Sequence, residues 1–209
     1  MKSNKKIGIL KLASGNIGSV QNIIDYCGGD SILIEKPADI IGIKKIIIPG
    51  VGHFDHAMKS LQERKQLLSE LEQIFLLKDV KVLGICLGMQ ILANFSEEGE
   101  KNGLGWIKGR VVRIQSEDSR VPRMGWIKTT FDRGNSLFKG FDSFEEVKFY
   151  HVHSYHFIPD DEEVIISRSD DDLKIVTGIQ QDNVTGLQFH PEKSHKYGIQ
   201  LFKNFLTQV

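Results

Sequence analysis

Short apolar runs alternate with helix-periodic segments through the first half of the chain, and this alternation constrains the fold most. Strand-like runs cover residues 7–12, 31–34, 46–48 and 80–85, and helical spacing appears over 20–27 and 61–77. Strands that are apolar at every position are typical of sheets covered on both faces. We therefore expect a mostly parallel sheet flanked by helices, with the functional loops gathered at the carboxyl ends of the strands.

The second half has another pattern. Short strand-like stretches separated by turn residues run over 111–114, 126–130, 147–150, 164–167, 175–179 and 184–189. They predict an added, mostly antiparallel β layer, and a helix around Leu201 and Phe205 closes the chain. The fold class expected is thus α/β and flavodoxin-like, and a chain of this length suits one domain over residues 1–209.

Composition excludes several classes of protein. The 27 basic and 27 acidic side chains balance, so no bulk charge favours nucleic acid or an anionic membrane. No apolar run approaches the roughly 20 residues that cross a bilayer. The basic start, residues 1–6, precedes an apolar run too short for a secretory signal. We expect a cytoplasmic protein whose two cysteines, Cys27 and Cys86, form no disulfide.

Cys86 stands in the chemically most specific stretch, Gly84-Ile85-Cys86-Leu87-Gly88, at the end of a strand-like run and before a helix-forming segment at 87–93. Glycines two residues to either side permit the sharp turn of a nucleophile elbow. The first free N–H groups of a helix favour thiolate over thiol. The alternative is that Cys86 is a small buried apolar residue, as many intracellular cysteines are.

A histidine and an acid follow the strand-like stretch near the end of the chain, as His190-Pro191-Glu192. On an extended segment Glu192 points to the same side as His190 and could hold its imidazole in one tautomer. Together with Cys86 they predict a Cys–His–Glu triad for nucleophilic catalysis. Taken alone, His190 is better explained as a satisfied core or surface histidine, and Glu192 and the elbow reverse that preference.

Glycines also follow the buried run at 46–48, in Pro49-Gly50-Val51-Gly52. Peptide N–H groups of Gly50, Val51 and Gly52 can turn toward a ligand there. With the N–H of Leu87 they could hold the oxyanion of a tetrahedral intermediate. His151 and His153 have the spacing of two imidazole ligands, but no acid or cysteine accompanies them, and no phosphate loop is present. We expect no metal and no cofactor.

These motifs resemble the triad (class I) glutamine amidotransferases, from about Ile7 to Leu206. Among them the match is closest to the glutaminase subunits of histidine biosynthesis, whose other signatures are similar to residues 49–54, 96–99, 121–126, 152–155 and 190–194. The resemblance implies hydrolysis of L-glutamine through a thioester on Cys86, with His190 carrying the proton and Glu192 orienting it. It also implies that the α-amino and α-carboxylate groups of glutamine bind Gln90, Glu98, His153, Ser154 and Tyr155.

The resemblance implies a partner as well: a (β/α)8-barrel synthase subunit that forms a heterodimer with the glutaminase and receives its ammonia through an internal channel. Positions similar to those near that interface are Met124, Trp126, Tyr150 and Lys193. Simple packing, or a solvated amine at Lys193, is the other interpretation of these four.

One segment departs from the family pattern. Lys11-Leu12-Ala13-Ser14-Gly15-Asn16 stands where the family has Asp-Tyr-Gly-x-Gly-Asn. This leaves open a paralogous glutaminase that supplies ammonia for amidation of a surface-polysaccharide sugar. A catalytically silent binding module is the third hypothesis, and the intact Cys86, His190 and Glu192 argue against it.

Overall fold

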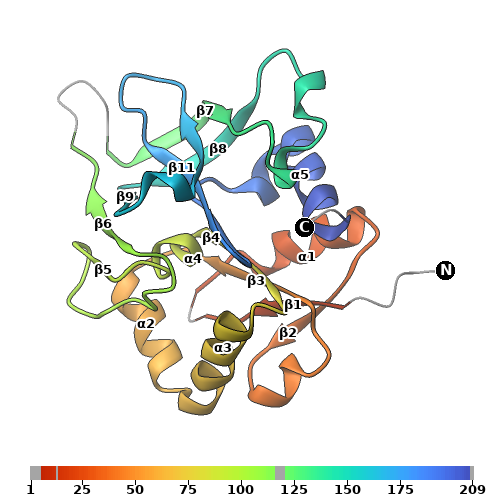
Figure 1. Cartoon of the computed structure of the whole chain (residues 1–209), viewed down its shortest axis with the longest axis vertical. Coiled ribbons are helices and arrows are strands. Elements are labelled where there is room, and N and C mark those ends of the chain that lie inside the picture. The colour runs from red at the N-terminus through yellow and green to blue at the C-terminus, as the bar shows by residue number, and fades with distance from the viewer. Residues whose placement is uncertain (1–5, 13, 116–120, 208–209) are drawn as a thin grey trace.

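A computed structural model describes residues 6–12, 14–115 and 121–207, and Figure 1 shows the chain with its elements labelled. The first five residues of the basic start, and Ala13 of the divergent segment, lie outside the described residues. A nine-stranded sheet has the order β2-β1-β3-β4-β12-β11-β10-β7-β8, and a three-stranded sheet has the order β5-β6-β9. The strands are β1 (Lys6–Leu10), β2 (Asp30–Ile34), β3 (Lys45–Gly50), β4 (Lys81–Cys86), β5 (Phe95–Ser96), β6 (Gly109–Arg113), β7 (Arg123–Phe131), β8 (Lys148–His153), β9 (Tyr155–Pro159), β10 (Ile165–Ser169), β11 (Val176–Gln181) and β12 (Val184–Leu187).

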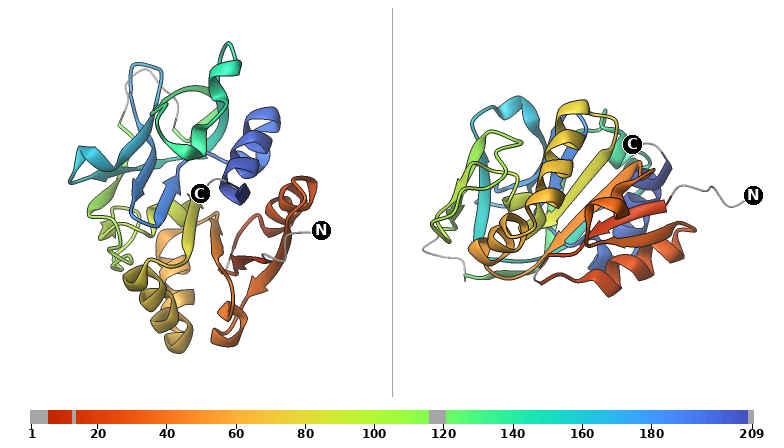
Figure 2. Two further views of the ribbon diagram at one scale, coloured as in Figure 1. Left: turned by 45° about the vertical axis from the view of Figure 1, so that its right-hand side comes forward. Right: turned by 90° about the horizontal axis from the view of Figure 1, so that it is seen from below.

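Helices cover the sheet on both faces, as the two views of Figure 2 show. The α-helices are α1 (Ile17–Tyr26), α2 (Phe54–Gln62), α3 (Lys65–Leu77), α4 (Leu87–Gln90) and α5 (His195–Thr207). Short 3-10 helices are η1 (Pro37–Ile40), η2 (Ser136–Phe138), η3 (Phe141–Ser143), η4 (Glu162–Val164) and η5 (Pro191–Lys193). Within the described residues, no helix has the length and apolar character needed to span a bilayer.

The predicted α/β class with parallel and antiparallel parts is confirmed. Strands β2, β1, β3, β4 and β12 run parallel, and β11, β10, β7 and β8 continue the sheet in antiparallel pairs. Most strands of the second half therefore extend the main sheet, and only β6 and β9 leave it to pair with β5. This arrangement sets the end of β12 directly beside the end of β4.

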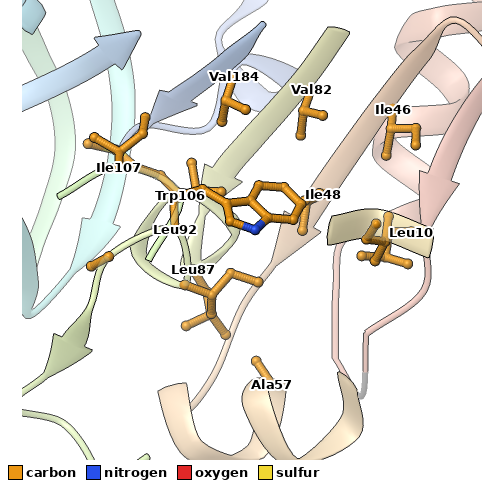
Figure 3. Close-up of a cluster of buried hydrophobic side chains, with 14 of the residues drawn as sticks. Leu10, Ile46, Ile48, Ala57, Val82, Leu87, Leu92, Trp106, Ile107 and Val184 are labelled. Atoms are coloured by element: carbon orange, nitrogen blue, oxygen red, sulfur yellow. The ribbon is translucent and has the colours of Figure 1, made fainter. Parts of the chain in front are cut away.

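Side chains of the central strands enter two separate cores. Ile46, Ile48 and Val82 pack on the face covered by α2 and α3, while Ile47 and Leu83 point to the face covered by α1 and α5. Successive residues of a strand point to opposite faces, so burial of both faces explains the unbroken apolar runs. Figure 3 shows the first face, where Leu10, Ile46, Ile48, Val82 and Val184 line up opposite Ala57 and Trp106.

Two predicted helices differ from those observed. The segment 61–77 is not one helix, because α2 ends at Gln62 and Arg64 takes the non-helical angles φ −97° and ψ 59° before α3 begins. The predicted helix at 87–93 is a single turn that ends at Gln90. One turn aligns few peptide dipoles, so the dipole expected to act on Cys86 is small, and its side-chain neighbours carry more weight.

Candidate active site

Cys86 occupies a strained elbow where β4 passes into α4. Its backbone angles are φ 54° and ψ −109°, in a region that residues with a Cβ rarely adopt. The side chain is only 6% exposed and lines a cavity at the carboxyl ends of β3 and β4. A strained residue that presents a nucleophilic atom to a cavity is the geometry of a nucleophile elbow.

The two flanking glycines make the elbow possible. A Cβ on Gly88 would lie 1.7 Å from the carbonyl oxygen of Ile48, and a Cβ on Gly84 would lie 2.5 Å from that of Gly88. No rotamer change relieves such a clash, because the obstacle is backbone. The Gly-x-Cys-x-Gly spacing is therefore a packing requirement between β3, β4 and α4.

His190 and Glu192 lie beside Cys86, as the sequence predicts. The His190 Nδ1 atom is 2.8 Å from a carboxylate oxygen of Glu192, and both side chains are 1% exposed. The backbone N–H of His190 donates to the carbonyl of Tyr150, and the Ser194 hydroxyl donates to the carbonyl of His190. Glu192 reaches the ring from the 3-10 turn η5, so the expected extended segment is wrong although the contact is present.

The neighbours of His190 keep its ring protonated. Burial lowers the pKa of His190, but hydrogen bonding and charge from Cys86 and Glu192 outweigh burial and raise the pKa to about 10. The His190 Nε2 atom has no hydrogen-bond partner of ordinary geometry among the described residues, so Cys86 acts on the ring mainly through its proximity. At neutral pH this environment therefore favours the imidazolium form of His190 beside the Cys86 sulfur.

The cavity next to the sulfur measures about 210 Å³, which suits a ligand of amino-acid size rather than a polymer. Of the residues predicted to bind substrate or oxyanion, all but Gly50 line it: Val51, Gly52, Leu87, Gln90, Glu98, His153, Ser154 and Tyr155. Gly50 instead pairs with Cys86 in the sheet, where a Cβ would lie 2.9 Å from the Cβ of Leu87. Gly52 has φ 99°, which suits a loop that turns its peptide groups.

Several lining groups are held by the protein itself. Glu98 accepts a hydrogen bond of 2.8 Å from the N–H of Phe54, at the start of α2. The His153 Nδ1 atom lies 2.8 Å from the Tyr155 carbonyl and therefore donates to it, and its Nε2 accepts from His151 at 3.1 Å. Burial lowers the pKa of His153 to about 3, so the ring is neutral.

Sequence reasoning missed two residues of the site. Gln188 is fully buried and donates to the Cys86 sulfur at 3.7 Å, and Asn16 donates to Glu192 at 3.1 Å. Gln188 precedes His190 by two residues, so the two-residue period of a strand could have revealed it. No local pattern pairs Asn16 with a residue 176 positions away.

The four residues expected at a partner interface lie near one another at the same end of the molecule. Met124 is 63% and Trp126 45% exposed, and the Trp126 ring contacts Tyr150 edge-on at 6.2 Å. Lys193 lines a second, larger cavity of about 370 Å³ between α1 and η5 that does not include Cys86. Glu192 forms part of its wall, so this cavity lies behind the His190–Glu192 pair.

Comparison with known proteins agrees with the geometry. The family described as glutamine amidotransferase class-I matches residues 27–209. The chain belongs to this family. Within it, a Methanococcus maripaludis protein named imidazole glycerol phosphate synthase subunit HisH 2 is 39% identical, over 97% of this chain and 100% of that protein. A Pseudomonas aeruginosa protein with the same name is 40% identical over the same shares.

Other class-I amidotransferases show the same relationship. A Leptospira interrogans protein named imidazole glycerol phosphate synthase subunit HisH is 36% identical over 96% of this chain and 99% of that protein. Among solved structures, the PurLQS structure from Thermotoga maritima matches with a TM-score of 0.76 at 18% identity, covering 99% of this chain and 98% of that one. A structure named glutamine amidotransferase matches with a TM-score of 0.75 at 19% identity, covering 96% of each. These two structures show the fold, and the resemblance inferred from the sequence motifs is confirmed.

Proposed function

We propose that the chain, as one glutamine amidotransferase domain over residues 1–209, is the glutaminase subunit of a cytoplasmic imidazole glycerol phosphate synthase. It hydrolyses L-glutamine to glutamate and ammonia, and the ammonia passes to a (β/α)8-barrel subunit that forms imidazole glycerol phosphate and AICAR in histidine biosynthesis. The observation that carries the proposal is the buried contact of His190 with Glu192 beside the strained Cys86. The assignment to histidine biosynthesis is supported by the names of relatives that are 36–41% identical to this chain.

The reaction follows from the charge state of the pair. The Cys86 thiolate attacks the side-chain amide carbon of glutamine, and the oxygen of that amide becomes an oxyanion. Peptide N–H groups of Val51, Gly52 and Leu87 stabilise the oxyanion. The His190 imidazolium gives its proton to the departing nitrogen, and ammonia leaves as the C–N bond breaks. A water molecule then loses its proton to His190 and cleaves the thioester to glutamate.

The substrate contacts follow from the free atoms of the cavity wall. Gln90 uses its N–H groups within the protein, so its carbonyl oxygen is available to the α-ammonium group of glutamine, together with the Glu98 carboxylate. Ser154 and Tyr155, next to His153, provide donors for the α-carboxylate. A zwitterionic amino acid requires acceptors for its ammonium group on one part of the cavity wall and donors for its carboxylate on another.

The proposed partner surface consists of Met124, Trp126, Tyr150 and Lys193. Two large apolar side chains exposed side by side are uncommon unless a partner covers them. Lys193 follows Glu192 directly, so a partner bound here lies one residue from the triad. This proximity gives the barrel subunit a route to influence glutaminase activity.

The test is reconstitution of the chain with its barrel subunit. We expect Cys86→Ala to abolish glutamine-dependent synthesis, by at least a thousandfold for loss of a nucleophile, while synthesis from added ammonium salts continues. Cys27→Ala, the matched change at the other cysteine, leaves both activities intact because that thiol lies outside the cavity. Loss of both activities in Cys86→Ala would show a structural role instead.

A second function is favoured by one observation. The divergent segment contacts the oxyanion loop, because the Ser14 hydroxyl donates to the carbonyl of Val51. In addition, two of the relatives carry the number 2 in their names. A paralogue that supplies ammonia for amidation of a surface-polysaccharide sugar would keep the same triad. Identification of the barrel subunit that copurifies with the chain, and of the acceptor it aminates, separates the two. If the chain releases no glutamate with any such partner, the remaining hypothesis is a catalytically silent binding module.

A further inference from the structure

A buried chain of amide groups connects a main-chain carbonyl to the sulfur of Cys86. Gln90 Nε2 donates to the Tyr155 carbonyl at 3.1 Å and to Gln188 Oε1 at 3.1 Å. Gln188 Nε2 in turn donates to the Cys86 sulfur at 3.7 Å. The three side chains are 5%, 0% and 6% exposed, respectively, so water does not compete effectively for these contacts.

The donor-to-acceptor direction of this hydrogen-bond chain follows from the contact of Gln90 with the Tyr155 carbonyl. A carbonyl oxygen can only accept, so the end of the Gln90 amide that faces Tyr155 is the nitrogen. That nitrogen then requires the oxygen of Gln188, and the nitrogen of Gln188 is left facing the sulfur. The fixed main chain of Tyr155 thus determines that Cys86 meets a donor and not an acceptor at this position.

We propose that Gln188 positions the Cys86 sulfur and stabilises its thiolate form through this oriented N–H. The inference rests on the proposed function, since it assigns a contact to the reacting atom of that site. An anionic sulfur accepts hydrogen bonds more strongly than a neutral thiol does. Gln188 therefore complements His190, which holds the proton, by holding the negative charge from a second direction.

The hydrogen bond from Gln188 to the sulfur bears on two steps of one turnover, thioester formation and thioester hydrolysis. When glutamine is attacked, the sulfur loses its negative charge to the new C–S bond. When water cleaves the thioester, that bond breaks and the electron pair returns to the sulfur as the thiolate leaves. A preorganised donor beside the sulfur stabilises the departing charge, so Gln188 favours the hydrolytic step in particular.

A substitution of Gln188 changes none of the titratable residues near the sulfur. His190 lies against the sulfur, and His153, Tyr155 and Glu98 line the same cavity. A change of the pH dependence of Cys86 reactivity after substitution of Gln188 alone is therefore assigned to loss of its oriented amide, whose N–H faces the sulfur and whose oxygen accepts from Gln90. A role of Gln188 in packing only would not move that pH dependence.

The experiment measures alkylation of Cys86 by iodoacetamide against pH, in the full chain, without glutamine. All proteins carry Cys27→Ser so that one thiol reacts. For Gln188→Met, which keeps the length of the side chain but removes the donor, we expect the midpoint of the profile to rise by about one pH unit. At pH values well below the wild-type midpoint the alkylation rate then falls about tenfold, as for loss of one hydrogen bond to a charged group. Gln180→Met, at a glutamine of β11 outside the cavity, leaves the profile unchanged.

An unchanged profile in Gln188→Met would overturn the proposal. If that variant loses its cooperative unfolding transition, Gln188→Asn replaces it, because the shorter side chain keeps an amide but withdraws it from the sulfur. The assay needs neither partner nor substrate. A failure of the wild-type complex to release glutamate would therefore contradict the proposed function, while the alkylation profile would still decide the role of Gln188.

Discussion

At the scale of single residues, the environment of His190 decides the chemistry. Its burial alone would leave a neutral ring, but Cys86 on one side and Glu192 on the other reverse the sign of the shift. Asn16 donates to the same carboxylate oxygen of Glu192 that His190 contacts, so the start of α1 helps to orient the acid. The ring is thus held in one orientation through the contact of its Nδ1 atom with Glu192.

Glu192→Gln tests this arrangement. The amide carries no charge, so we expect the pKa of His190 to fall from about 10, and the imidazolium that protonates the departing amide nitrogen to be less populated at neutral pH. Glutaminase turnover of the complex falls by at least about a hundredfold, in the range known for orienting acids of triads. NMR titration of His190 gives the pKa, and Glu146→Gln, at an exposed acid, serves as control. A His190 titration identical to wild type would contradict this account.

At the scale of secondary-structure elements, the elbow depends on the close approach of α4 to β3 and β4. Sequence periodicity predicts these strands well, because both of their faces are buried and each strand is apolar after its first lysine. It predicts helices less well, since it reads α2 and α3 as one segment and extends α4 beyond its single turn. Apolar residues at 91–93 are buried by the sheet whether they are helical or not, so their pattern alone does not end the helix.

Gly88→Ala is the matching prediction for this element. Its Cβ would lie 1.7 Å from the carbonyl oxygen of Ile48, and the main chain must move to accommodate it. We expect the free energy of unfolding to fall by more than about 3 kcal/mol, measured by denaturant titration. Gly18→Ala in α1 has open space around its Cβ and is expected to raise stability by up to about 1 kcal/mol. Equal effects of the two substitutions would exclude the steric explanation.

At the scale of the whole molecule, the site forms where the parallel and antiparallel parts of the large sheet meet, because β12 pairs with β4 on one side and β11 on the other. Strand β8 lies at the far edge of the sheet, yet it contacts the site, because the N–H of His190 donates to the carbonyl of Tyr150. The buried pair His151 and His153 therefore lies close enough to His190 for their charges to interact.

This pair predicts an acid-sensitive fold. Burial, together with neighbouring positive charge, lowers the pKa of His151 well below 6.5, and burial lowers that of His153 to about 3. On acidification the unfolded chain therefore binds these protons first, so the stability is fully present above pH 6.5 and is lost as the pH falls from 6.5 toward 3. We expect His151→Phe to reduce the slope of unfolding free energy against pH by up to about 1.4 kcal/mol per unit in this window. His56→Phe, at an exposed position, should leave the slope as in wild type, and an unaltered slope in His151→Phe would refute the assignment.

Local sequence patterns were enough to predict the α/β class, the elbow around Cys86 and the candidates His190 and Glu192, because each depends on residues within one strand and the loop that follows it. The folded arrangement was needed to show that most later strands extend the main sheet, that Glu192 reaches the ring from a 3-10 turn, and that Gln188 and Asn16 contact the site. Periodicity and turn chemistry act over only a few residues, so they do not reveal contacts between distant parts of the chain. The contacts of Gln188 with Cys86 and of Asn16 with Glu192 join residues 102 and 176 positions apart, and they exist only once the sheet has assembled.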